Sequence, residues 1–193
     1  MIAGIVLVLI VSLYRLLPAF LGYTTVQPDW FINVSPMAAL ILCGAATLPK
    51  RWAIAVPFVA LLGTDLILNA HYGHPLINAE FLAKTVAFGI IASFGWQLRK
   101  NARAAVLFPA VIGGSIFFYL VTNTASWFYD PGYLKNLSGW TQAMTTGLPA
   151  FQPTWMFYRN TFVSDMVFTA LFLLCVRPVQ SSERPEKVPA AAW

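Results

Sequence analysis

The chain of 193 residues is 59% hydrophobic and only 10% charged, with a formal net charge of +5. A soluble domain carries roughly 25% charged residues, so this composition excludes a soluble enzyme, a disordered chain and a nucleic-acid-binding protein. The two cysteines, Cys43 and Cys175, lie in separate apolar stretches and form neither a disulfide framework nor a zinc-binding pattern. The sequence therefore predicts a protein that is embedded in a lipid bilayer.

Six apolar stretches approach the length of about 20 residues that a membrane-spanning helix needs. The first has no basic N-terminal region and continues past Arg15, so we interpret it as a retained helix and not as a signal peptide. The second begins at Ser35-Pro36, where a proline suits the first turn of a helix. The expected fold is an all-α membrane domain over 1–176, with spanning helices at about 2–21, 35–49, 52–70, 80–97, 104–128 and 157–176.

The basic residues of the connecting segments gather on one side of this bundle. The loops on the opposite side, 22–34, 71–79 and 129–156, contain a single Lys or Arg residue, Lys135. Because cytoplasmic loops carry the excess of Lys and Arg, we expect both termini in the cytoplasm. The eight basic residues on the cytoplasmic side are Lys50, Arg51, Arg99, Lys100, Arg103, Arg177, Arg184 and Lys187.

Two segments outside the six helices carry separate predictions. The tail 177–193 is rich in proline and charge, and we expect it to be a disordered cytoplasmic segment. The outer loop 129–156 is too long for a simple connection and contains Trp140 and Trp155. It is either a lid on the outer face or a belt of aromatic residues at the membrane interface.

Strongly polar side chains within the helices gather in the outer half of the bundle. At a rise of ~1.5 Å per residue, each is placed on the side away from the basic loops. The inner half offers only Ser, Thr, Gln97 and the cysteines. Since ionisable groups in a bilayer usually face a cavity, the pattern predicts a polar cavity open to the outer face. The residues concerned are Arg15, Asp65, Asn69, Lys84, Asn123 and Asp165.

The same residues are also consistent with interhelical contacts that only hold the bundle together. In that interpretation Arg15 or Arg159 neutralises Asp65 or Asp165. Asn33 and Ser35 would cap the helix that begins at 35.

Enzymatic chemistry is not expected. A serine nucleophile at 113–115 would need a histidine base at similar depth, and no histidine lies in a predicted helix. The sequence has no H-E-x-x-H motif and no P-loop, and we expect no cofactor. His71 and His74 are more simply explained by a solvated turn than by a metal site.

Four short segments resemble a known family. They are 33–39 (NVSPMAA), 62–65 (LGTD), 117–123 (FFYLVTN) with Trp127, and Asn160-Thr161 with Asp165. In this order, over about 12–176, they resemble an uncharacterised family of small bacterial membrane transport proteins. That family is similar in turn to the S-components of energy-coupling-factor vitamin transporters.

The resemblance implies a six-helix S-component fold in the bacterial cytoplasmic (inner) membrane and capture of a small vitamin-like solute from outside. It also implies a partner, a transmembrane coupling subunit with ATPases, although solitary S-components are known. Small residues at four-residue spacing, which would contact that subunit, are not evident in 2–21. Ser35, Ala39 and Cys43 form such a face in 35–49 instead.

The leading hypothesis is therefore a substrate-binding membrane transport protein with polar groups for specificity and aromatic walls for buried area. The main alternative is a structural or accessory subunit of a larger membrane complex. The candidate substrate-binding residues are Asn33, Asp65, Asn69, Asn123, Trp127, Arg159, Asn160, Asp165, Arg15 and Lys84.

Overall fold

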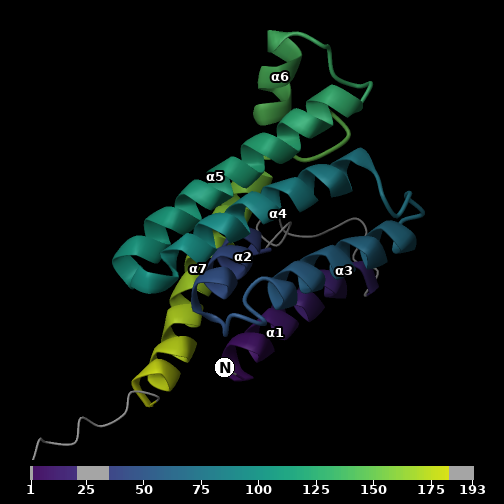
Figure 1. The fold of residues 1–193 in the computed structure, drawn as a ribbon. Coiled ribbons are helices and arrows are strands. Elements are labelled where there is room, and N and C mark those ends of the chain that lie inside the picture. Colours follow the sequence, from purple (N-terminus) through teal and green to yellow (C-terminus); the bar gives the residue numbers. More distant parts are fainter. Residues whose placement is uncertain (1, 21–34, 183–193) are drawn as a thin grey trace, which may run out of the picture.

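The computed structural model describes residues 2–20 and 35–182. Within these ranges the chain is entirely helical and contains no strand (Figure 1). The elements are α1 (Ile2–Phe20), α2 (Met37–Thr47), α3 (Ala55–His71), α4 (Ala79–Gln97), the 3₁₀ helix η1 (Leu98–Asn101), α5 (Ala104–Tyr129), α6 (Leu137–Met144) and α7 (Thr154–Ser182).

Helix α2 is the centre of the bundle. It contacts α3, α4, α5 and α7, and every residue from Met37 to Ala46 is buried. Small residues make this close packing possible: a Cβ at Gly95 of α4 would lie 2.5 Å from the carbonyl oxygen of Leu42, and one at Gly44 would lie 2.6 Å from Pro57. With 11 residues, α2 is only about 16 Å long and cannot cross a bilayer core of about 30 Å alone.

The helices around α2 expose many large apolar side chains. Val59 of α3 is 69% exposed, Leu82 of α4 is 55% exposed and Leu174 of α7 is 70% exposed. Two described segments are long and apolar enough to cross a membrane, Ala79–Asn101 and Ala104–Tyr129. Most residues of both segments are not buried, so much of the apolar surface of these helices does not pack within the bundle.

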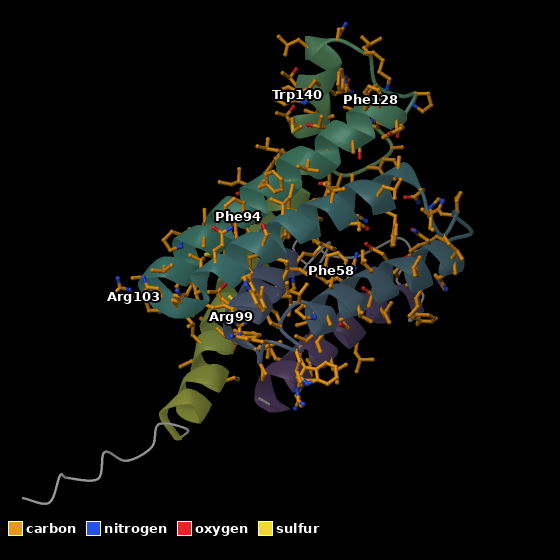
Figure 2. All side chains as sticks on the ribbon, in the orientation of Figure 1. Phe58, Phe94, Arg99, Arg103, Phe128 and Trp140 are labelled. Carbon is orange, nitrogen blue, oxygen red and sulfur yellow. The ribbon has the colours of Figure 1, made fainter. Side chains whose placement is uncertain are left out.

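The two ends of the bundle differ in character. The beginning of α1, the α2–α3 connection, η1 and the end of α7 lie together at one end (Figure 1). Arg99 and Arg103 lie at this end, and Trp140 lies at the opposite end with Phe128 (Figure 2). We call the first the basic end and the second the α6 end.

The structure departs from the sequence prediction in two places. The outer segment 129–156 contains a helix, α6. Asn136 caps its N-terminus, because the Asn136 side chain accepts a hydrogen bond from the Gly139 amide at 2.9 Å. Helix α7 continues to Ser182, beyond the expected end at 176, so the first residues of the predicted disordered tail are helical. The rest of that tail, 183–193, lies outside the described residues, as does Asn33.

Candidate functional site

A cavity of about 220 Å³ lies toward the α6 end of the bundle, between five helices. Its residues come from the end of α1, the beginning of α2, the beginning of α4, the second half of α5 and the beginning of α7. All of these helix ends are remote from the basic end. The lining residues are Arg15, Met37, Glu80, Lys84, Ser115, Phe118, Tyr119, Thr122, Asn123, Ser126, Thr154, Phe157, Tyr158 and Thr161.

An ionic network forms one wall of the cavity. The Arg15 guanidinium donates to the Asp65 carboxylate and, at 2.7 Å, to the Thr64 hydroxyl. The Lys84 ammonium lies 3.6 Å from the same Asp65 oxygen and 2.6 Å from a Glu80 oxygen. The Asp65 side chain is only 4% exposed, whereas that of Glu80 is 57% exposed. Two cations and two carboxylates therefore balance one another, and the wall is polar but has no net formal charge.

The cavity residues from α5 and α7 include four aromatic side chains, Phe118, Tyr119, Phe157 and Tyr158, which we call the aromatic wall, and six polar side chains beside them. The rings of Tyr119 and Tyr158 are 4.7 Å apart, and Phe118 stacks on Phe88 of α4 at 5.3 Å. Ring contacts of this kind fix the orientation of each side chain. A bound molecule would therefore meet aromatic rings together with hydroxyl and amide groups from α5 and α7, and charged side chains from α1 and α4.

Asp165 lies behind the cavity and not among its lining residues. It is fully buried, and its Oδ1 accepts a hydrogen bond from the Ala39 amide at 2.9 Å. The residue before α2, Pro36, provides no side-chain cap. Because the first amides of a helix lack partners within it, Asp165 acts as the cap of α2 from a different helix.

The remaining predicted residues are divided between the cavity and the helix ends. Asn123 lines the cavity and donates to the Tyr119 carbonyl at 2.8 Å. Asn69 donates to the Leu76 carbonyl, and the Trp127 indole donates to the Leu134 carbonyl, so both support turns outside the cavity.

Arg159 points away from the cavity. It is exposed and lies over the Trp155 ring, with 5.7 Å between the guanidinium carbon and the ring centre. Its Nε also donates to the side chain of Asn160, which is buried. Of the ten sequence-predicted residues, the cavity lining therefore contains Arg15, Lys84 and Asn123, and Asp65 joins it through the ionic network.

The predicted site residues do not include most of the aromatic wall or the hydroxyl groups beside it. The spacing of these residues in the sequence does indicate that they share a helix face. Positions 119, 122, 123 and 126 of α5, and positions 154, 157, 158 and 161 of α7, follow the i, i+3, i+4, i+7 spacing of one helix face. Polar and aromatic side chains on one stripe of an otherwise apolar helix indicate the face that is turned away from lipid.

Helix α6 is docked at the end of α5. The Tyr119 hydroxyl donates to the Met144 carbonyl, and the Trp140 indole donates to the Thr124 hydroxyl at 3.1 Å. No α6 residue belongs to the cavity lining. The segment 129–156, which the sequence suggested as a lid or an interfacial belt, thus contains a helix that lies beside the cavity and contacts the cavity residue Tyr119.

Two further sequence expectations concern metals and coupling. The described residues contain no group of three His, Cys, Asp or Glu side chains that could hold a metal ion. His71 packs against Phe20, with their ring centres 5.0 Å apart. The small-residue face of Ser35, Ala39 and Cys43 is buried inside the bundle, so it packs against neighbouring helices of the same chain and is not open to a coupling subunit.

Comparison with protein families gives one match, and it covers residues 1–187. The family is described as "Family of unknown function (DUF6580)". Searches of the curated proteins and of the solved structures found no match. Since the match covers nearly the whole chain, the protein belongs to the DUF6580 family.

Proposed function

We propose that this protein is a multi-pass membrane protein that binds a small solute in the cavity at the α6 end. The membrane placement is supported by the low charge content and by the apolar side chains that α3, α4 and α7 expose. Exposed apolar surface on this scale is unfavourable in water and matches a lipid environment. All helices except α6 belong to the embedded bundle, with the short α2 enclosed by the others.

One observation carries the binding proposal: a cavity with an ionic wall and an aromatic wall lies at the end remote from the basic connections. By the positive-inside rule, the basic end is cytoplasmic and the cavity opens to the outer face. Binding sites for small molecules combine apolar surface with a few convergent polar groups, and the two walls supply these components. The outer-facing position suits capture of a solute for uptake.

The charges of the cavity define the class of solute. Arg15 and Lys84 are already paired with Asp65 and Glu80, so no unbalanced cation is left for a polyanion. Pockets for drug-sized ligands usually measure about 300–1,000 Å³, and this one is smaller, at about 220 Å³. We therefore expect a small ring-containing solute that is neutral or zwitterionic, and not a phosphorylated compound.

The resemblance to S-components adds vitamin uptake across the bacterial inner membrane and a coupling subunit with ATPases to the proposal. Because the small-residue face of α2 is buried, docking to such a subunit would use the outer surfaces of other helices.

An accessory subunit of a larger membrane complex is the second candidate. Two observations favour it: the ionic network is internally satisfied, and Asp165 caps α2. Under this alternative both features only stabilise the bundle, and the cavity holds water.

Mass spectrometry of small molecules released from the purified, denatured protein tests the binding proposal. The wild-type protein should release a stoichiometric solute. Thr122→Phe should release none, because Thr122 lines the cavity and a phenyl ring would occupy it. Leu120→Phe is the matched control, since Leu120 lies on the exposed side of α5, and it should retain the solute. Stoichiometric partner chains and no solute in the wild-type sample would favour the accessory subunit instead.

A further inference from the structure

A second hollow lies nearer the basic end of the bundle and differs in chemistry from the cavity. It measures about 360 Å³, and α2, α4, η1 and α5 form its walls. Apart from Gln97, its residues are apolar: Leu42, Ile91, Phe94, Leu98, Ala110, Gly113, Gly114 and Phe117. Leu42 and Ile91 are buried and form the floor, while Phe94 and Gly113 are exposed at the opening. We call this hollow the α4–α5 groove.

Gly113 lies at the opening of the groove. A Cβ at Gly113 would meet no neighbouring atom within 4 Å, so there is open space at this position for a larger side chain. The groove lies on the two helices that are long and apolar enough to span a membrane. Its apolar lining suits a hydrocarbon chain and offers little to a polar solute.

Two exposed cations lie where the groove meets the basic end. Lys100 follows Leu98 in η1, and Arg103 immediately precedes α5; both are exposed. Within the described ranges, neither residue lies within ion-pair distance of a carboxylate. Arg99 is different, because its guanidinium donates to the carbonyls of Ala45 and Leu48 at the end of α2. Figure 2 shows Arg103 at the end of the α4–α5 pair, with Phe94 farther along it.

We propose that the α4–α5 groove binds one anionic phospholipid, with an acyl chain in the groove and the phosphate at Lys100 and Arg103. Basic pockets between membrane helices on the cytoplasmic side recognise anionic headgroups in this way. The charge complementarity favours a lipid over an apolar helix of a partner, which would leave both cations without a counter-charge. The inference rests on the proposed membrane placement but not on the binding of a solute.

Native mass spectrometry of the detergent-purified protein tests the site, using phosphatidylglycerol and phosphatidylcholine with the same acyl chains. The wild type should retain one phosphatidylglycerol more strongly than phosphatidylcholine. The double variant Lys100→Gln, Arg103→Gln should bind phosphatidylglycerol about 30-fold more weakly, since each cation contributes about a factor of five to six near an anionic surface. Its binding of phosphatidylcholine should not change.

Two leucine variants examine the groove itself. Gly113→Leu should abolish retention of both lipids by filling the groove. Gly89→Leu is the matched control, because Gly89 is also an open helical position but does not line the groove, and it should behave like the wild type. Since leucine favours a helix more than glycine does, loss of folding is not expected in either variant.

Three results would overturn this proposal. In the first, Gly113→Leu retains as much phosphatidylglycerol as the wild type. In the second, the Lys100→Gln, Arg103→Gln variant still prefers phosphatidylglycerol to phosphatidylcholine. In the third, the wild type carries a bound polypeptide that is absent from Gly113→Leu. Each leaves solute binding intact, because the lipid assay does not involve the cavity. A protein that stays soluble and monodisperse without detergent would instead overturn the membrane placement and the lipid site together.

Discussion

At the scale of single residues, the Arg15–Asp65 pair connects α1 with α3 and faces the cavity. Its side chains are only 9% and 4% exposed, so either charge left alone would be poorly solvated. Removing one partner of a buried ion pair costs more than replacing both by apolar residues. The pair therefore supports the bundle even if it also contacts a solute.

Asp65→Ala should lower the free energy of unfolding by about 3–5 kcal/mol, because it leaves the Arg15 guanidinium buried without its counter-charge. The double variant Arg15→Met, Asp65→Leu should recover most of this loss. Glu80→Gln is the control, and it should cost less than about 1 kcal/mol because the Glu80 side chain is 57% exposed. Thermal unfolding in detergent measures all three. Equal melting temperatures for Asp65→Ala and Glu80→Gln would contradict a structural role for the pair.

At the scale of elements, Asp165 shows how a functional interpretation of a polar residue changes once its partner is known. The sequence places a carboxylate in an apolar helix, which is consistent with either a ligand contact or a structural bond. The structure gives it the amide of Ala39 as a partner. A substitution of Asp165 should therefore destabilise α2, the central helix.

Asp165→Ala should lower stability by about 1–3 kcal/mol, because a buried amide of α2 loses its acceptor. Asp165→Asn keeps a side-chain oxygen at this position and should cost clearly less. Melting temperatures of the two variants test this cap. If Asn is as harmful as Ala, the carboxylate charge matters more than the hydrogen bond to Ala39.

The contact between α6 and α5 leads to a second prediction for an element. Tyr119→Phe removes the hydroxyl that donates to the Met144 carbonyl. A bond worth roughly 1 kcal/mol corresponds to about fivefold faster local opening, so amide hydrogen exchange within 137–144 should accelerate by that factor. Tyr158→Phe keeps the contact of the two rings and should leave this exchange unchanged. No change in Tyr119→Phe would show that α6 is held by other contacts alone.

The sequence predicts the existence and order of α1 to α5 and of α7 because apolar runs end at proline-containing or basic turns. It does not predict that α2 is a buried core helix, since residues such as Leu40 and Ile41 are equally suited to lipid and to a protein interior. Helix α6 was missed because its eight residues mix polar and apolar types over barely two turns. Side-chain partners at long range, such as Ala39 for Asp165, leave no trace in local spacing.

At the scale of the whole molecule, the proposed function depends on the basic residues and the cavity lying at opposite ends of the bundle. Lys100 and Arg103 belong to the basic end, while Asn123 and Ser126 belong to the cavity near α6. If the basic end is cytoplasmic, the cavity must open outward. The depth pattern in the sequence predicts a polar cavity remote from the basic loops, and three of the residues on which that prediction rests, Arg15, Lys84 and Asn123, line the cavity near α6. The side of the membrane that each end faces remains a prediction.

Cysteine labelling in right-side-out membrane vesicles tests this central claim most directly. In a background with Cys43 and Cys175 replaced by alanine, a membrane-impermeant maleimide should label Ser126→Cys in sealed vesicles. Lys100→Cys should be labelled only after the vesicles are permeabilised. Labelling of Lys100→Cys in sealed vesicles, with Ser126→Cys protected until permeabilisation, would place the cavity on the cytoplasmic side and contradict uptake from outside.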